Sequence, residues 1–196
     1  MIAALYVRTG GAYFDLNGVD PWDEVRDARK YDSSLPIVAH PPCQLWVNLT
    51  YVNYKRWGGE HNRPGNDGGC FASALANVRR CGGVLEHPAD SKAWKAYGLL
   101  TPIGMGWRGI GNEYTCEVWQ SAYGHKARKR TWLFYKGPKP FELRWDRNPG
   151  THWVGNSDST PGNKKPTLGK NEAISTPLEF RDELIKLAKH SAIPKT

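Results

Sequence analysis

A short apolar run that ends on two prolines constrains the fold of this chain more than any other feature. Residues 36–44 read Pro-Ile-Val-Ala-His-Pro-Pro-Cys-Gln. The β-branched residues and the flanking breakers are typical of a buried parallel strand, and the prolines end it because proline has no N–H to donate to a sheet. Ligands of open α/β sheets bind beyond the carboxyl ends of the strands. Cys43 is therefore a candidate nucleophile, although a cysteine after two prolines is equally well a small buried residue.

The remaining pattern predicts one α/β domain over residues 1–196, a length that fits a single core. An apolar stripe predicts a helix over 70–80, and a capping box at Thr176–Glu179, with Pro177 at the first helical position, predicts the start of a last helix. Residues 45–69 are expected to form an irregular functional loop, and 136–170 an irregular segment rich in Pro, Gly and Lys. Further strands are expected at 2–7, 84–87, 114–120 and 131–135, and short helical turns at 23–30 and 90–97.

Charge and composition point to a polyanionic partner. The chain carries a formal net charge of +8, and its 9 Trp and 9 Tyr suit stacking on bases as well as ordinary packing. Its four cysteines have no paired spacing, and no apolar run is long enough to cross a membrane. We therefore expect a cytoplasmic protein with free thiols, no membrane and no metal, and nucleic acid is the first candidate partner.

Three segments follow successive expected strands and carry groups that could converge on one cleft. They are Pro41-Pro42-Cys43-Gln44, Leu85-Glu86-His87-Pro88, and Tyr123-Gly124 followed by Arg128 and Arg130. In this order and spacing they resemble the cytosine-5 DNA methyltransferase family over about residues 36–135, with a weaker likeness at Asn171–Pro177. The resemblance implies a reduced Rossmann-like methyltransferase sheet, mostly parallel, with a C-terminal antiparallel hairpin.

The same resemblance implies a covalent mechanism on cytosine. Cys43 would add to carbon 6 of the ring, because carbon 5 is a poor nucleophile until such an addition makes it enamine-like. A protonated Glu86 would bond a ring nitrogen, which requires a pKa raised by burial. Arg128 and Arg130 would hold the base oxygen and the backbone of an extruded nucleotide. A free thiol has a pKa of about 8.5, so a nearby arginine or a helix N-terminus has to assist it, and the basic cluster at 126–130 could supply that field.

The resemblance also implies S-adenosylmethionine as cofactor and DNA, duplex or single-stranded, as partner. The cofactor loop departs from the family pattern, because Ala4 replaces its acid and Arg8 replaces its first glycine. The glutamine of the hairpin motif is missing, and no target-recognition domain fits in the chain, so a partner subunit would supply specificity. The expected cofactor contacts are Gly10, Gly11, Asp20 and Pro41, and the expected nucleic-acid contacts are Gln44, Tyr54, Lys55, Arg56, Trp57 and Lys126.

Several alternatives stay open. The same cysteine chemistry could use an anionic donor, which Arg8 would suit better than a cation, or act on a free nucleotide. The chain could also be a catalytically silent nucleic-acid-binding module that counters host restriction, and its small size suits a phage-encoded protein. Glu86 could simply bond backbone groups, and residues 126–130 could be a solvated hairpin edge. Amino-methyltransferase, zinc-deaminase and His40–Cys43–His87 zinc-site readings fit the residue spacing less well.

Overall fold

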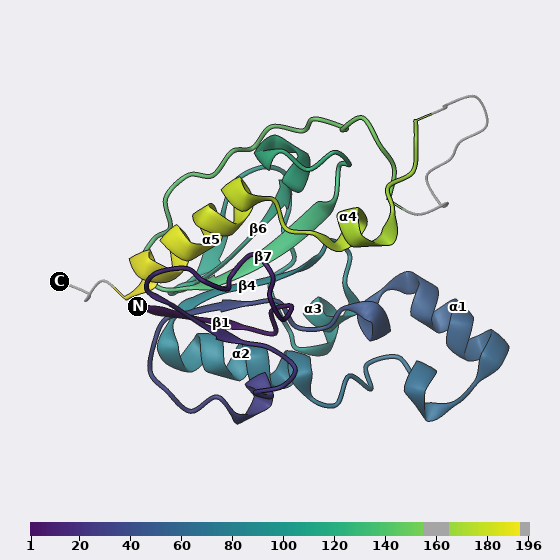
Figure 1. Cartoon of the computed structure of the whole chain (residues 1–196), viewed down its shortest axis with the longest axis horizontal. Coiled ribbons are helices and arrows are strands. Elements are labelled where there is room, and N and C mark those ends of the chain that lie inside the picture. The colour runs from purple at the N-terminus through teal and green to yellow at the C-terminus, as the bar shows by residue number, and fades with distance from the viewer. Residues whose placement is uncertain (155–164, 193–196) are drawn as a thin grey trace.

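The chain folds into one seven-stranded sheet flanked by helices, with the strand order β2-β1-β3-β4-β7-β6-β5. This computed structural model describes residues 1–154 and 165–192. The α/β class expected from the sequence is confirmed (Figure 1). The strands are β1 (Ile2–Leu5), β2 (Val19–Trp22), β3 (Ile37–Ala39), β4 (Gly83–Pro88), β5 (Arg108–Ile110), β6 (Glu113–Trp119) and β7 (Arg130–Lys136).

The sheet is mixed, so the expectation of a mostly parallel sheet is not met. β1 pairs in parallel with β2 and β3, and β3 with β4, whereas β4–β7, β7–β6 and β6–β5 are antiparallel. The antiparallel half arises because short connections join β5 to β6 and β6 to β7, and such connections reverse the chain direction. The expected antiparallel hairpin is β6–β7. Since β7 lies between β4 and β6, strands β4 and β6 run in the same direction.

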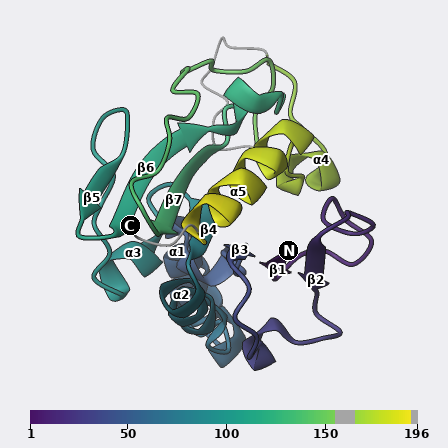
Figure 2. The same cartoon turned by 90° about the vertical axis from the view of Figure 1, so that its left-hand side faces the viewer.

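Helices cover both faces of the sheet (Figure 2). On one face α2 (Cys70–Cys81) and α3 (Lys92–Ala96) pack with Ala3 and Leu5 of β1 in one core cluster. On the other face α5 (Leu178–Ser191) packs with Ile2 and Ala4, because alternate residues of a strand point to opposite faces. Burial on both faces explains why β1, β3 and β4 are apolar runs rather than alternating ones.

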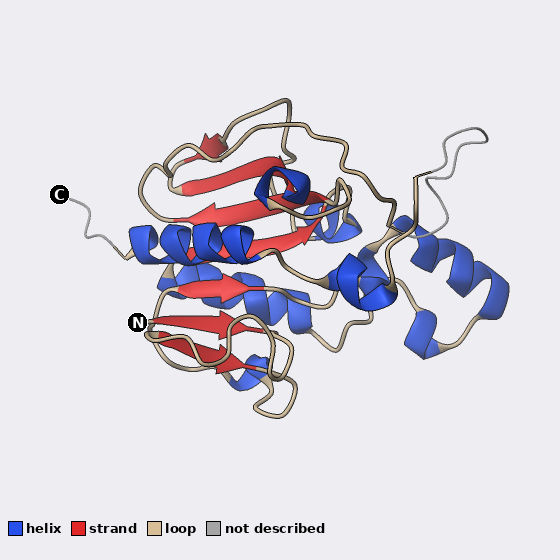
Figure 3. Cartoon of the chain, turned by 45° about the horizontal axis from the view of Figure 1, so that its top comes forward, coloured by secondary structure: helices blue, strands red, loops and turns tan. Residues whose placement is uncertain are grey.

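Residues 45–69 contain a helix where an irregular loop was expected. α1 (Asn48–Trp57) lies between the short 3-10 turns η2 (Gln44–Trp46) and η3 (Glu60–Asn62), and it projects from the body of the molecule (Figures 1 and 3). The sequence gives no apolar stripe for α1 because the helix buries only Thr50 against the body. Strands β2 and β5 were also not expected; Pro21 is tolerated in β2 because β2 is an edge strand.

The C-terminal part begins differently from the expected capping box. Pro177 occupies the N-cap of α5 and makes no side-chain cap bond, so Thr176 lies before the helix and does not cap it. Glu179 instead pairs with Arg144 at 2.5 Å. Residues 137–154 and 165–169 contain no helix or strand, and α4 (Lys170–Ile174) precedes α5. The remaining 3-10 turns are η1 (Ala28–Lys30) and η4 (Gln120–Tyr123). Among the described helices, none has the length and apolar composition needed to cross a membrane.

Candidate active site

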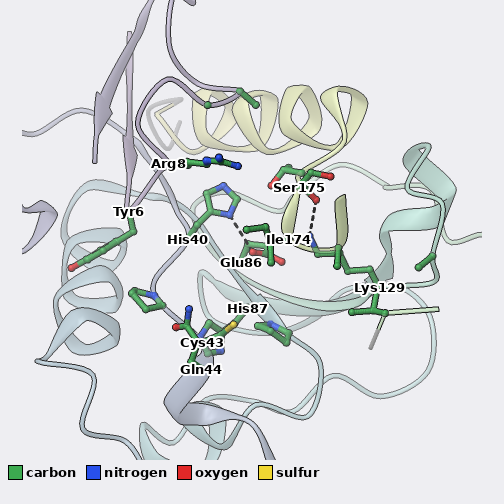
Figure 4. A pocket seen from close by; sticks show the side chains of 18 of the residues that line it. Tyr6, Arg8, His40, Cys43, Gln44, Glu86, His87, Lys129, Ile174 and Ser175 are labelled. Carbon is green, nitrogen blue, oxygen red and sulfur yellow. Dashed lines mark hydrogen bonds and ion pairs between the residues drawn. The ribbon is translucent and has the colours of Figure 1, made fainter. Parts of the chain in front are cut away.

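A cavity of about 690 Å³ opens at the carboxyl ends of β1, β3 and β4. Its volume lies in the range of small-molecule sites, and its position is the usual one for ligands of α/β sheets. Figure 4 shows side chains from several segments facing it. The lining comes from residues 6–8, 11–13, 40–44, 86–88, 127–130, 152–154 and 173–176.

Cys43 lies in this lining, in the turn between β3 and η2. It is partly exposed and is the only one of the four free cysteines in the lining. Burial, and next the negative charge of Glu86, raise the pKa of its thiol, while the positive charge of Lys129 lowers it. The thiol is therefore protonated in the free protein at neutral pH, and forming the thiolate requires a change on ligand binding.

Glu86, near the end of β4, is held by two side chains. Its Oε2 lies 3.1 Å from Nδ1 of His40, and its Oε1 accepts a hydrogen bond from Nε2 of Gln120 at 3.2 Å. Nε2 of His40 in turn lies 2.8 Å from the hydroxyl of Tyr13. Burial raises the pKa of Glu86, but the hydrogen bond and charge of His40 outweigh it, so the net pKa is lowered. The expectation of a raised Glu86 pKa is wrong for the ligand-free protein, because the contact with His40 joins residues 46 positions apart and no sequence pattern indicates it.

The turn before β7 places Arg128, Lys129 and Arg130 in the lining with different contacts. Arg130 pairs with Glu117 at 2.7 Å and Asp90 at 2.8 Å, which ties it to the sheet. The guanidinium of Arg128 lies 5.2 Å from the ring centroid of Trp119.

Lys129 is the cation of the 126–130 cluster whose charge acts on both Cys43 and Glu86, whereas the resemblance assigned roles to Arg128 and Arg130. Burial lowers the pKa of its amine, while the charges of Glu86 and Cys43 raise it. Its Nζ donates to the backbone oxygen of Ser175 at 2.7 Å (Figure 4).

The expected cofactor contacts are only partly brought together. Gly11 and Pro41 line the cavity, whereas Gly10 and Asp20 do not. Asp20 bonds Arg26 at 2.5 Å and Nε1 of Trp22 at 2.8 Å.

An acid does lie beside the glycine turn, but it is Asp23. Directly after β2, its Oδ2 accepts from the hydroxyl of Thr9 at 2.7 Å. It is not part of the lining, where Glu86 is the one acid among the described residues. The described residues at this end of the cavity fit S-adenosylmethionine poorly, because they offer the ribose no acid and bring the cation Arg8 into the lining of a site for a cationic cofactor.

The expected nucleic-acid contacts lie mostly outside the cavity. Gln44 is exposed at the lining. Lys126 pairs with Glu172 at 2.7 Å and is not part of the lining. The other four lie on α1, where the guanidinium of Arg56 sits 4.9 Å from the ring centroid of Trp57; they are Tyr54, Lys55, Arg56 and Trp57.

The zinc alternative finds no ligand cluster within the described ranges. There, no group of three or more His, Cys, Asp and Glu is arranged to hold a metal ion. His87 is fully buried, with Nδ1 2.7 Å from the hydroxyl of Ser91, and burial lowers its pKa to about 4. It is a neutral side chain of the core.

The structure thus gathers Cys43, Glu86 and the turn at 128–130 around one cavity, and it gives specific contacts there to His40 and Lys129, for which the resemblance implied no individual role. A nucleophile, a hydrogen-bonded acid and a cation in one concave site are the components of covalent catalysis. Comparisons with family models, curated proteins and solved structures find no match for the chain.

Proposed function

We propose that this protein modifies carbon 5 of a cytosine in DNA through a covalent adduct between Cys43 and the base. The observation that carries the proposal is the presence of Cys43, Glu86 and Lys129 in the lining of one cavity. The sheet adds support, since β4 and β6 run in the same direction with β7 reversed between them, in keeping with a reduced Rossmann-like methyltransferase sheet.

The chemistry begins with sulfur. The thiol of Cys43 gives its proton to solvent, and the thiolate forms a bond to carbon 6 while the C5–C6 double bond becomes a C4–C5 double bond and the C4–N3 π electrons move onto the ring nitrogen N3, which takes the proton of Glu86. Carbon 5 then bonds the incoming electrophile and loses its hydrogen as a proton, after which the S–C6 bond breaks and the double bond returns. Because burial disfavours the thiolate, Lys129 is the group that compensates its charge.

Glu86 stabilises the charge that addition places on the ring. A carboxyl that donates to a ring nitrogen has to carry a proton, and in the free protein Glu86 is ionised beside His40. We assign the supply of this proton to His40, whose Nδ1 is in hydrogen-bond distance of the carboxyl. Gln120 fixes the other carboxyl oxygen, so the acid keeps its orientation.

DNA is the substrate that the surroundings of the cavity favour. A base in a duplex has to leave its stack to reach a pocket of this kind. Beside the cavity, η2 leads from Cys43 into α1, which carries aromatic and basic side chains and no acid. Such a mixture suits stacking on bases and contact with phosphates. The resemblance implies methyl transfer as the default chemistry and a partner subunit that selects the DNA sequence. The small size of the chain suits a phage-encoded protein that acts in the cytoplasm of a bacterial host.

Hydrogen exchange at carbon 5 tests the covalent step without a donor. Addition of the thiolate to carbon 6 lets carbon 5 take up deuterium from D2O, and reversal yields 5-deuterocytosine, which mass spectrometry detects. We expect exchange in a cytosine oligonucleotide with the wild-type protein and none with Cys43→Ser. Cys81→Ser, a change outside the cavity, should behave as wild type. Equal exchange by Cys43→Ser and wild type would refute the proposal, and absence of exchange with retained DNA binding would favour the silent binding module.

A further inference from the structure

The part of the cavity that follows β1 carries a cation of its own. Arg8 follows β1 by three residues and lies with Gly11 and Tyr13 in the lining. Figure 4 shows Arg8 on one side of the His40 ring and Cys43 on the other. A ligand at Arg8 would therefore be a part of the substrate remote from the reacting carbon, or a second reactant.

No acid in the described residues pairs with Arg8. Neighbouring arginines have partners: Arg26 bonds Asp20 at 2.5 Å, and Arg181 bonds Asp182 at 2.7 Å. Glu86, the only acid that the described part of the chain contributes to the lining, is bonded to His40 and Gln120. Arg8 is exposed and lines the cavity, and its guanidinium makes no hydrogen bond or ion pair with the part of the chain that the structure describes.

The turn after Arg8 limits what else could bind a ligand there. The N–H of Gly11 donates to the backbone oxygen of Arg8 at 2.9 Å, so this donor is already used. A Cβ at Gly11 would lie 2.8 Å from that oxygen, and Gly10 has a φ of +64°, so the tight turn requires both glycines. The glycines therefore fix the position of Arg8 rather than cradle a cofactor with their backbone.

The charges that line the cavity indicate which class of ligand it binds. Arg8 and Lys129 face the cavity at its two ends, and the single acid between them is engaged. Low-dielectric walls concentrate this positive field, which attracts anions and repels a sulfonium. Arginine also binds phosphate and carboxylate groups through two parallel hydrogen bonds.

We propose that Arg8 is the ligand of an anion-binding subsite, which takes a phosphate or carboxylate group carried by the pyrimidine substrate or by the donor. The inference rests on the proposed function, because it names the class of molecule that occupies the second part of the same cavity. If the anion belongs to the donor, the donor is an acidic molecule and not S-adenosylmethionine. If the anion belongs to the substrate, Arg8 recognises the 5′-phosphate of the cytosine nucleotide.

Calorimetry at low salt tests the subsite with three probes: deoxycytidine 5′-monophosphate, deoxycytidine and inorganic phosphate. The matched variants are Arg8→Gln and Arg108→Gln; Arg108 is an exposed arginine on β5 outside the lining, so both remove one positive charge. We expect the monophosphate to bind the wild-type protein at least tenfold more tightly than the nucleoside, and Arg8→Gln alone to remove the difference. That result assigns the anion to the substrate.

The other outcomes separate the donor, the subsite and the proposed function. Equal binding of nucleotide and nucleoside, with inorganic phosphate bound by wild type but not by Arg8→Gln, assigns the anion to the donor. If Arg8→Gln changes no affinity, or if Arg108→Gln has the same effect, the subsite is overturned. Deuterium exchange is measured in parallel on deoxycytidine, because this reaction needs no anion. If exchange occurs but Arg8→Gln changes no affinity, the proposed function stands and the subsite is overturned. If Arg8→Gln abolishes anion binding but no exchange occurs, the subsite stands and the proposed function is overturned.

Discussion

At the scale of single residues, the state of the site depends on a histidine that the sequence does not single out. His40 bridges Tyr13 and Glu86, two residues that are 27 and 46 positions away from it in the chain. It holds the pKa of Glu86 below its ordinary value although burial acts in the opposite direction. Glu86 and His40 are therefore electrostatically coupled, and a change to His40 changes the pKa of Glu86.

Replacing His40 should raise the pKa of Glu86. His40→Asn removes the charge and the ring hydrogen bond, so burial becomes the dominant effect on the carboxyl. The measurement is a pH titration of the Glu86 carboxyl carbon by NMR, with the pH profile of deuterium exchange recorded on the same variant. Tyr13→Phe is the control, since it keeps the His40–Glu86 contact. An unchanged titration in His40→Asn would show that His40 does not control the acid.

His87 should make the protein less stable in mild acid. Its folded-state pKa is about 4 against an ordinary 6.5 because burial disfavours the charged ring. The unfolded chain therefore takes up a proton that the folded chain refuses, and the free energy of unfolding falls as the pH drops from about 6.5 to about 4, by about 3 kcal/mol from this group. Urea unfolding across this range measures the slope. His87→Gln should flatten it, while replacement of the exposed His61 by Gln should not.

The residue pattern predicts Cys43 and Glu86 at the site but does not predict the side chains that contact them. Cys43 and Glu86 follow strands, so the order of strands along the chain placed both at one edge of the sheet. His40, Gln120 and Lys129 act through side-chain contacts between distant segments, which strand patterns do not encode. The sequence does not predict β2, so it cannot show which acid follows that strand. Asp20 lies within β2, whereas Asp23 follows it and bonds Thr9.

At the scale of elements, the β6–β7 hairpin is braced by a carboxylate. Glu117 accepts from both sides of the Arg130 fork, at 2.9 and 2.7 Å, and from the indole nitrogens of Trp132 and Trp119 at 3.0 Å each. Burial raises its pKa, but these hydrogen bonds outweigh burial and lower the pKa to about 2. Arg130 is thereby a structural cation of the hairpin, which leaves the turn before it to present Lys129.

Glu117→Gln should destabilise the protein at neutral pH. A carboxylate whose folded pKa is lowered stabilises the fold above its unfolded pKa, here about 4.5, and loses that contribution as the pH falls toward about 2. We expect a loss of up to about 3 kcal/mol at pH 7 that shrinks below pH 4.5, measured by urea unfolding. Glu113→Gln on the same strand is the control, because the more exposed pair of Glu113 with Arg79 contributes less. A loss that is the same at pH 7 and pH 3 would contradict the ionic brace.

The elements that the sequence predicts are those whose side chains pack on the sheet. The stripe of Phe71, Leu75 and Val78 predicts α2, and the stripe beginning at Phe180 predicts α5, because both helices bury one face. α1 buries almost nothing, and β5 is fully exposed, so neither leaves a periodic signal. Pattern reasoning detects burial, and it cannot detect an element that is stabilised only by backbone hydrogen bonds and local turns.

At the scale of the whole molecule, the positive charge and the projecting helix argue for a polyanion. The net charge is +8, and α1 carries Lys55 and Arg56 with no acid among its residues. Large apolar side chains are exposed on the same helix, with Tyr51 at 51 % and Trp57 at 68 %. A folded chain gains nothing from exposing aromatic rings to water, so the helix is suited to a partner whose bases stack on them.

DNA binding through α1 should therefore depend on salt and on these two cations. Each phosphate contact contributes about −0.9 to the slope of log affinity against log salt on duplex DNA. The double variant Lys55→Ala and Arg56→Ala should weaken binding and reduce the magnitude of the slope by about 1.8, measured by fluorescence anisotropy over a range of salt concentrations. Lys92→Ala with Lys95→Ala on α3 removes the same charge away from the cavity and should leave the slope closer to wild type. A flat salt response of the wild-type protein would exclude DNA and leave a free nucleotide as the substrate, because one phosphate releases too few counterions to give a steep slope.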